Sequence, residues 1–246
     1  MSYVKGLDIS IVRGQLDFNA LKAEGYEFII CRCGVGNDPS DTLYASNMQK
    51  GAAAGLKMAA YHFVYPLPSD PSKPSHDAKV QAAMHYKAAG DVLPFLDLEW
   101  PVVQNWAKWG CTAPQIVQWT IDYLQEYERI SGVRPVVYTY PSFADAIKLP
   151  ASFGQDYKLW IASYTSTPRI PAPWTDWIMW QTTGGTLVQG RQIDTDVAKD
   201  LSLWDNVSGS SQASASRLNS EASSPSDTTP PDPAMTDAID TTFNGN

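Results

Sequence analysis

Short apolar segments alternate with amphipathic stretches along the first 205 residues. Eight of these segments have the length and composition of strands, and four stretches between the early ones follow the helical period, three of them ending at a glycine (Gly25, Gly55, Gly90). The predicted strands are Tyr3–Ile9, Glu27–Arg32, Leu56–Phe63, Val92–Leu98, Arg134–Tyr140, Tyr157–Tyr164, Trp177–Thr182 and a weak one at Gln192–Asp194. The predicted helices are Phe18–Glu24, Thr42–Ala54, Ser75–Ala89 and Ala113–Ser131.

Alternating strands and helices are typical of a parallel sheet. The last three strands lie too close together in the sequence for full helices between them. The pattern therefore predicts the α/β class, as an irregular TIM-like barrel of eight strands whose second half has lost its helices. Such barrels carry their chemistry at the carboxyl ends of the strands.

Composition changes abruptly near residue 206. The segment 206–246 is rich in Ser, Pro, Thr and Asp and holds a single aromatic residue, Phe243. It cannot bury enough apolar surface to offset the entropy of ordering it. We therefore expect a folded barrel over residues 1–205 and a disordered C-terminal tail over 206–246.

Charge and composition exclude several classes of partner. The formal net charge is −8, which disfavours nucleic acid, and no apolar stretch approaches the length of a membrane span. Cys31, Cys33 and Cys111 are too few and too unevenly spaced, with the three histidines, for a metal site, so we expect buried thiols, no metal and no cofactor. We also expect a monomer, and no signal peptide is evident at the N-terminus.

Four acidic residues stand at the ends of predicted strands. Asp8 closes the first strand, Asp97 and Glu99 close the fourth, and Asp194 lies in the eighth. In a barrel these residues converge on one mouth.

Asp97 and Glu99 are the most informative pair. Side chains two residues apart on a strand share a face, so their Cβ atoms are expected roughly 6.5 to 7 Å apart. Crowded carboxyls favour the protonated form of one member, which a general acid requires, and Glu99 at the outer position is the candidate. The alternative is that the pair caps the next helix or binds a surface lysine.

Abundant aromatic residues beside paired acids suggest a carbohydrate substrate, because sugar rings stack on Trp and Tyr and glycoside hydrolysis uses carboxyl groups. Each of the aromatic residues can equally be buried in the core. The candidates at predicted strand ends are Tyr61, Tyr138, Trp160, Tyr164 and Trp180.

These motifs, in this order and spacing, resemble the family 25 glycoside hydrolases, the Chalaropsis-type lysozymes. The resemblance spans about residues 4 to 200. The motifs that carry it are Gly6-Leu7-Asp8-Ile9-Ser10, Ala59-Ala60-Tyr61-His62-Phe63, Leu96-Asp97-Leu98-Glu99, Leu159-Trp160-Ile161-Ala162-Ser163-Tyr164, Trp180-Gln181 and Ile193-Asp194.

The resemblance implies a barrel of five βα units followed by three strands. It also implies a muramidase that cleaves the β-1,4 bond between N-acetylmuramic acid and N-acetylglucosamine in bacterial peptidoglycan. By matching position, Glu99 would be the general acid and Asp97 would orient or stabilise the reacting sugar. Asp8 and Asp194 would complete an acidic floor.

The chain departs from the family pattern at two places. Where the family often reads Arg-Ala-Thr-Glu-Gly, this chain has Arg32-Cys33-Gly34-Val35-Gly36, which loses the acidic member. The last strand usually resembles Val-Asp-X-Asn, and Asp196 stands here in the position of the Asn. Either Asp194 or Asp196 can therefore fill the fourth acidic position.

Two chemical routes and two rival functions stay open. A water activated by Asp97 or a neighbour would invert the anomeric centre, whereas attack by the N-acetyl oxygen of the substrate would retain it. We favour the second route because both carboxyls come from one strand. The rivals are a catalytically silent glycan-binding protein and a chitinase-like N-acetylglucosaminidase. We expect a phage endolysin released through holin pores, or a lysozyme of the phage particle, with non-classical bacterial export as the alternative.

Overall fold

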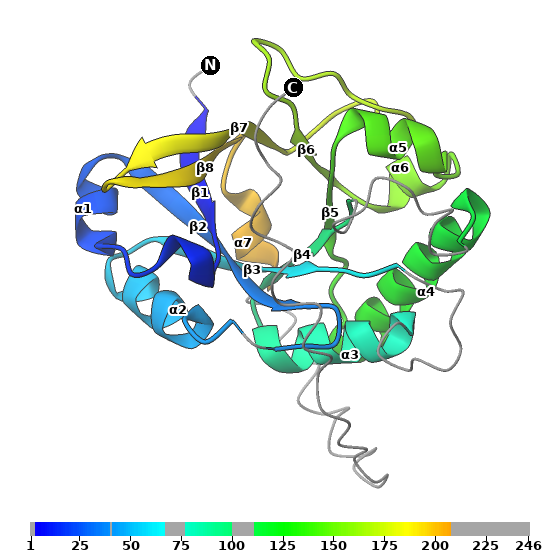
Figure 1. Cartoon of the computed structure of the whole chain (residues 1–246), viewed down its shortest axis with the longest axis horizontal. Coiled ribbons are helices and arrows are strands. Elements are labelled where there is room, and N and C mark those ends of the chain that lie inside the picture. The colour runs from blue at the N-terminus through cyan, green and yellow to red at the C-terminus, as the bar shows by residue number, and fades with distance from the viewer. Residues whose placement is uncertain (1–2, 40, 67–76, 100–110, 208–246) are drawn as a thin grey trace, which may run out of the picture.

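The computed structural model describes residues 3–39, 41–66, 77–99 and 111–207, and its centre is a closed eight-stranded barrel (Figure 1). Neighbours in the barrel follow the order of the chain, and the eighth strand closes onto the first. Every predicted strand segment overlaps an observed strand. The strands are β1 Val4–Ile9, β2 Tyr26–Val35, β3 Lys57–Phe63, β4 Leu93–Asp97, β5 Val136–Thr139, β6 Leu159–Ala162, β7 Met179–Val188 and β8 Arg191–Ala198.

The last strand runs against its neighbours, which the parallel prediction missed. Strands β1 to β7 pair in parallel, but β8 is antiparallel to both β7 and β1. The cause is a two-residue connection, Gln189 and Gly190, both with positive φ, which is the hairpin geometry that suits twisted strands. Only the centre of β8 was expected, because most of its residues are polar. One consequence is that Asp194 and Asp196 lie within a strand and not at its carboxyl end.

All four predicted helices are present, with shorter ends in three cases. They are α1 Phe18–Ala23, α2 Tyr44–Ala53, α3 Ala78–Ala89 and α4 Ala113–Ser131, and the first two predicted residues of the third, 75–76, lie outside the described residues. Four further short elements in the described part of the chain were not predicted. They are the 3₁₀ helix η1 Ile11–Arg13 and the helices α5 Pro141–Ile147, α6 Phe153–Asp156 and α7 Ser202–Val207.

Helix α7 lies against one end of the barrel interior. Trp204 packs on Phe28 inside the barrel, and its indole N–H donates to the carbonyl of Met58 at 2.9 Å. The predicted boundary between residues 205 and 206 therefore falls inside a helix that belongs to the fold. The rest of the predicted tail, 208–246, lies outside the described residues.

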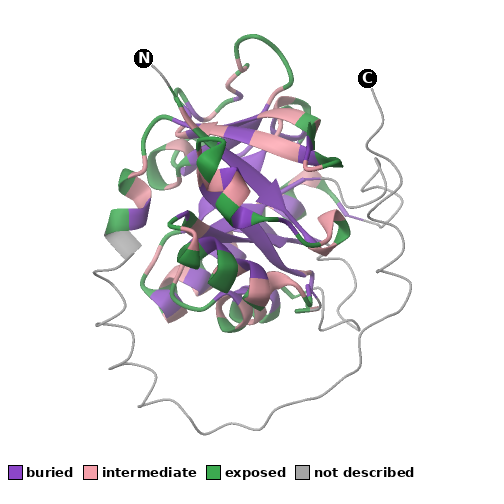
Figure 2. Ribbon diagram, turned by 90° about the vertical axis from the view of Figure 1, so that its left-hand side faces the viewer, coloured by how far each residue is buried: buried purple, intermediate pink, exposed green. Residues whose placement is uncertain are grey.

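Apolar side chains from the strands fill the barrel. Figure 2 shows the strands buried in the interior and exposed residues on the helices around them. Trp160 is at the centre of the filling and contacts the rings of Tyr61, Phe95 and Tyr138. A second apolar layer separates the strands from the helices. Because the interior is packed, a ligand can only be bound at an end of the barrel.

A buried polar cluster joins β3 to the helices outside it. The hydroxyl of Tyr123 on α4 lies 2.8 Å from Nδ1 of His62 and 2.7 Å from Nδ1 of His85. Nε2 of His62 lies 2.7 Å from the carbonyl oxygen of Gly36. Burial lowers the pKa of both histidines, so they are neutral at pH 7. The three cysteines are also buried and free, which confirms the expectation of buried thiols.

Candidate active site

The barrel brings all four predicted acids together at one mouth. Asp8 precedes the last residue of β1, Asp97 is the last residue of β4, and Glu99 follows two residues later. Asp194 on β8 is the direct pairing partner of Asp8 on β1. The charges of Asp8 and Asp194 act on Asp97 and Glu99, raising their pKa values, so the four carboxyls lie within one electrostatic cluster.

Glu99 has the properties that a general acid requires. The backbone N–H of Leu98 still bonds to the carbonyl of Tyr138 on β5, at 3.0 Å, so the chain keeps its course just beyond β4 and carries Glu99 to the mouth. The side chain is buried, and Oε2 meets no hydrogen-bond donor in the described part of the chain. Burial, followed by the charges of Asp8 and Asp194, raises the pKa of Glu99 to about 8. The carboxyl is therefore protonated at neutral pH, as the crowding of acids predicted.

Asp97 lies beside a buried arginine that the sequence analysis did not select. Burial and the charge of Glu99 raise the pKa of Asp97, whereas the positive charge of Arg32 lowers it. Nε of Arg32 lies 3.4 Å from Oδ2 of Asp41, and both side chains are almost fully buried. The same Oδ2 accepts the backbone N–H of Ile11 at 2.8 Å. A charged residue, Arg32, inside the otherwise apolar second half of β2 was the signal that could have revealed this pair.

Gln181 on β7 is a second residue that was missed. Its Nε2 donates to Oδ2 of Asp8 at 2.7 Å, and its Oε1 accepts the hydroxyls of Tyr138 at 3.0 Å and Tyr164 at 2.8 Å. One buried amide therefore connects the acid of β1 to two tyrosines of the mouth. The alternation of side chains along β7 could have identified it, because Gln181 and its neighbour must face opposite sides of the strand.

That neighbour, Trp180, is not part of the mouth, so its selection as a substrate contact is corrected. Its ring packs against Trp177 in the layer between barrel and helices, and its indole N–H donates to the carbonyl of Ser163. Gln181 faces inward, paired with Ala162 and Asp196. The physical reason is the two-residue period of a strand, which places adjacent residues on opposite faces.

The other four aromatic candidates are at the mouth but differ in access. Trp160 is 2% exposed and lies beneath the acids, where its indole N–H donates to Oδ1 of Asp196 at 2.8 Å. It therefore supports the floor and offers no open face to a sugar. Tyr61 and Tyr138 are also largely buried beside it. Tyr164 is 49% exposed and presents an aromatic face to solvent, with its hydroxyl held by Gln181.

Asp194 and Asp196 occupy different depths of the same cluster. The side chain of Asp194 is 19% exposed and pairs with Arg13 of η1 at 3.5 Å. Burial and the charge of Asp8 raise its pKa to about 7, against the opposing effect of Arg13. Asp196 is 2% exposed and lies between Trp160 and Asp8. Asp194 therefore faces the mouth, and Asp196 is part of the floor.

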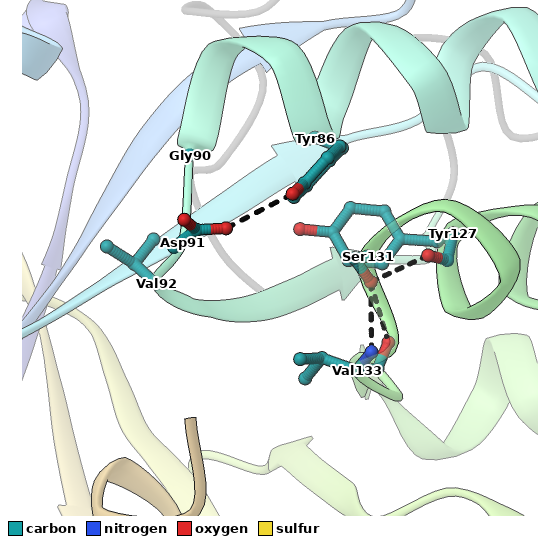
Figure 3. Close-up of a pocket in the computed structure, with 7 residues that line it drawn as sticks. All are labelled: Tyr86, Gly90, Asp91, Val92, Tyr127, Ser131 and Val133. Atoms are coloured by element: carbon teal, nitrogen blue, oxygen red, sulfur yellow. Dashed lines mark hydrogen bonds between the residues drawn. The ribbon is translucent and has the colours of Figure 1, made fainter. Parts of the chain in front are cut away.

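A small hollow lies at the other end of β4 and includes none of these residues (Figure 3). The Tyr86 hydroxyl donates to Asp91 across it at 3.1 Å. Among the described residues, no group of three or more His, Cys, Asp and Glu side chains could hold a metal ion. No helix among them is long and apolar enough to cross a membrane. The residues lining the hollow are Tyr86, Gly90, Asp91, Val92, Tyr127, Ser131 and Val133.

A protonated carboxyl among several other carboxyls, at a mouth that also holds an exposed aromatic ring, is an arrangement suited to glycoside hydrolysis. Comparison with known proteins agrees with this chemistry. The model of the glycosyl hydrolases family 25 matches residues 7–191.

Two curated relatives and one solved structure illustrate the similarity. The chain is 26% identical to the N,O-diacetylmuramidase of Chalaropsis sp, over 72% of this chain and 87% of that protein. It is 24% identical to lysozyme M1 of Streptomyces globisporus, over 79% of this chain and 67% of that protein. The structure of a family GH25 lysozyme from Aspergillus fumigatus superposes with a TM-score of 0.72 at 26% identity, covering 82% of this chain and 99% of the other. The chain therefore belongs to glycosyl hydrolase family 25.

Proposed function

We propose that this protein is a peptidoglycan muramidase, which hydrolyses the β-1,4 bond between N-acetylmuramic acid and N-acetylglucosamine. The observation that carries the proposal is the buried, protonated Glu99 among ionisable neighbours at the mouth of the barrel. The names of the relatives, a lysozyme and an N,O-diacetylmuramidase, support the choice of substrate. A protein that only bound glycans would gain nothing from a carboxyl held protonated at neutral pH.

In the proposed mechanism, Glu99 donates its proton to the oxygen of the scissile bond as that bond breaks. Asp97 reaches the mouth from the same strand end, so it is placed to steady the acetamido group of the sugar at the cleavage site. The acetamido oxygen then attacks the anomeric carbon, and the resulting ring is opened by water, to which Glu99 now acts as a base. The exposed ring of Tyr164 would stack against a neighbouring sugar.

The proposal is tested by measuring the release of reducing ends from purified peptidoglycan. We expect the native protein to cleave, and Glu99→Gln to lose about 10²- to 10⁴-fold in rate, because the amide has no proton to give. Glu24→Gln makes the same chemical change on an exposed side chain and is the matched control, expected to retain full activity. Binding of peptidoglycan by both native protein and Glu99→Gln without any cleavage would refute the proposal in favour of a silent glycan-binding protein.

Two further measurements test the substrate and the route. Activity on chitin oligosaccharides without activity on peptidoglycan would replace the muramidase by a chitinase-like enzyme. The anomer that is first released, followed by proton NMR, tests participation of the acetamido group. Retention of the β configuration is the expected result, and inversion would instead require a water activated by a carboxylate on the opposite face.

A further inference from the structure

The carboxyls of Asp8 and Asp196 face one another below the mouth. On the paired strands β1 and β8, Asp196 lies opposite Gly6, and Asp8 is the next inward residue along β1. Gly6 has no side chain, and a Cβ there would meet the ring of Phe28 at 2.1 Å. The side chain of Asp196 therefore has no partner directly across from it and reaches diagonally to Asp8, with which it forms a hydrogen bond.

The surrounding hydrogen bonds determine where a proton can lie. The indole N–H of Trp160 can only donate, so Oδ1 of Asp196, at 2.8 Å, is an acceptor. Oδ2 of Asp196 is buried and meets no N–H or O–H donor in the part of the chain that the structure describes. Two ionised carboxylates cannot share such a contact, because neither has a hydrogen to donate. One proton must therefore lie on this pair.

We infer that Asp196 holds this proton and donates it in a hydrogen bond that positions an ionised Asp8. The two residues differ in what stabilises a negative charge. Asp8 accepts the amide N–H of Gln181 at 2.7 Å and is close enough to Arg13 to be influenced by its charge. The neighbours of Asp196 come from several elements. They are Asp8 on β1, Asp194 on its own strand, Trp160 on β6, its pairing partner Gln181 on β7 and Tyr164.

None of these neighbours of Asp196 is a cation, and two are acids. Burial and the charge of Asp8 raise the pKa of Asp196 well above its usual range, and the bond to Asp8 raises it further. Burial also raises the pKa of Asp8 above its usual value, but the bonds from Gln181 and Asp196 and the charge of Arg13 oppose that rise. Asp196 is thus a positioning residue that acts through Asp8. Ionisation of Asp196 would place two charges in contact and displace Asp8.

The inference rests on the proposed function for its kinetic test only. Asp196→Asn keeps the shape, accepts from Trp160 and donates N–H to Asp8, so we expect its rate at pH 6 to lie within about threefold of the native rate. Asp196→Ala leaves Asp8 without this donor and is expected to lose about 10- to 100-fold. Asp8→Asn, the reciprocal change, removes the charge that the arrangement preserves and is expected to be as impaired as the alanine variant.

The pH profile distinguishes this role from a purely structural one. In the native protein, two protons must stay bound, on Glu99 and on Asp196, so log(kcat/KM) should fall with a slope of one above the pKa of Glu99 and with a slope approaching two once Asp196 also ionises. In Asp196→Asn only Glu99 titrates, and the slope should be one. An active Asp8→Asn with an inactive Asp196→Asn would overturn the inference, because the proton would then reside on Asp8.

A measurement without substrate separates this inference from the proposed function. Aspartate labelled with carbon-13 at the side-chain carboxyl reports protonation directly by NMR. We expect a native carboxyl signal that stays in the protonated range at pH 7 and is missing from folded Asp196→Asn. If every aspartate signal that depends on residue 196 is ionised at pH 6, the inference fails even in an active enzyme. If the native protein cleaves no glycan but the protonated signal is present, the inference stands and the muramidase proposal fails.

Discussion

The protonated Glu99 is expected to cost the native protein stability, and Glu99→Gln should recover it. The pKa of Glu99 is about 8 in the folded protein against a model value of 4.5. Because the folded pKa is raised, the unfolded chain loses its proton first as pH rises, and the folded state becomes progressively less stable between pH 4.5 and pH 8. At 1.36 kcal/mol per pH unit, this amounts to about 3 kcal/mol at pH 7 and about 5 kcal/mol above pH 8.

Glutamine has no proton to lose, so Glu99→Gln escapes this penalty. We expect the free energy of unfolding of the variant, minus that of the native protein, to rise by about 3 kcal/mol between pH 4 and pH 7. Urea unfolding followed by tryptophan fluorescence at several pH values measures this difference. Any effect of the substitution that does not depend on pH cancels in the comparison.

Glu24→Gln is the control for the loss of an exposed carboxyl. The reasoning is refuted if the difference between Glu99→Gln and native protein is the same at pH 4 and pH 8. Such a result would mean that Glu99 titrates alike in the folded and unfolded states, and it would then be ionised at neutral pH and unable to donate a proton.

Two other variants test the mouth and the scaffold. Tyr164→Phe keeps the exposed ring but loses the bond to Gln181, so we expect kcat to fall with little change in KM. Tyr164→Ala also loses the ring and should raise KM for glycan oligomers about fivefold. Equal KM values in the two variants would contradict a stacking role. Tyr123→Phe leaves two buried histidines without their shared partner and is expected to lower the free energy of unfolding by about 3 kcal/mol while kcat/KM is unchanged. Denaturant unfolding and steady-state kinetics check this, and a fully stable variant would show that the cluster contributes nothing.

Much of this architecture could be predicted because its causes are local. Apolar runs ended by turn residues identify strands, and Asp97 and Glu99 follow such a run directly. The convergence of Asp8 with Asp97 then follows from the geometry of a barrel. The resemblance to a known family supplied the roles of these acids, which no local pattern specifies.

The missed features depend on contacts that are distant in the sequence. The local sequence does not distinguish Gln181 from any other polar residue in a strand. Its role depends on contacts with Asp8, 173 positions away, and with two tyrosine hydroxyls. Trp180 is as aromatic as Tyr164, and only the phase of β7 decides that Gln181, and not Trp180, faces the mouth. The direction of β8 was missed for two reasons. Its many polar residues weaken the pattern of a strand, and the two-residue turn before it requires a positive φ at Gln189, which glutamine rarely adopts.

The closure of β8 onto β1 also determines when the enzyme can become active during its synthesis. Asp8 lies on the first strand of the barrel, and its partners Asp194 and Asp196 lie on the last, so they are synthesised well after it. A nascent chain that has not yet reached these residues lacks both the seam of the barrel and two of the five acids at its mouth and floor. Catalytic competence therefore requires the last strand of the barrel, and a chain that ends before β8 is expected to be inactive.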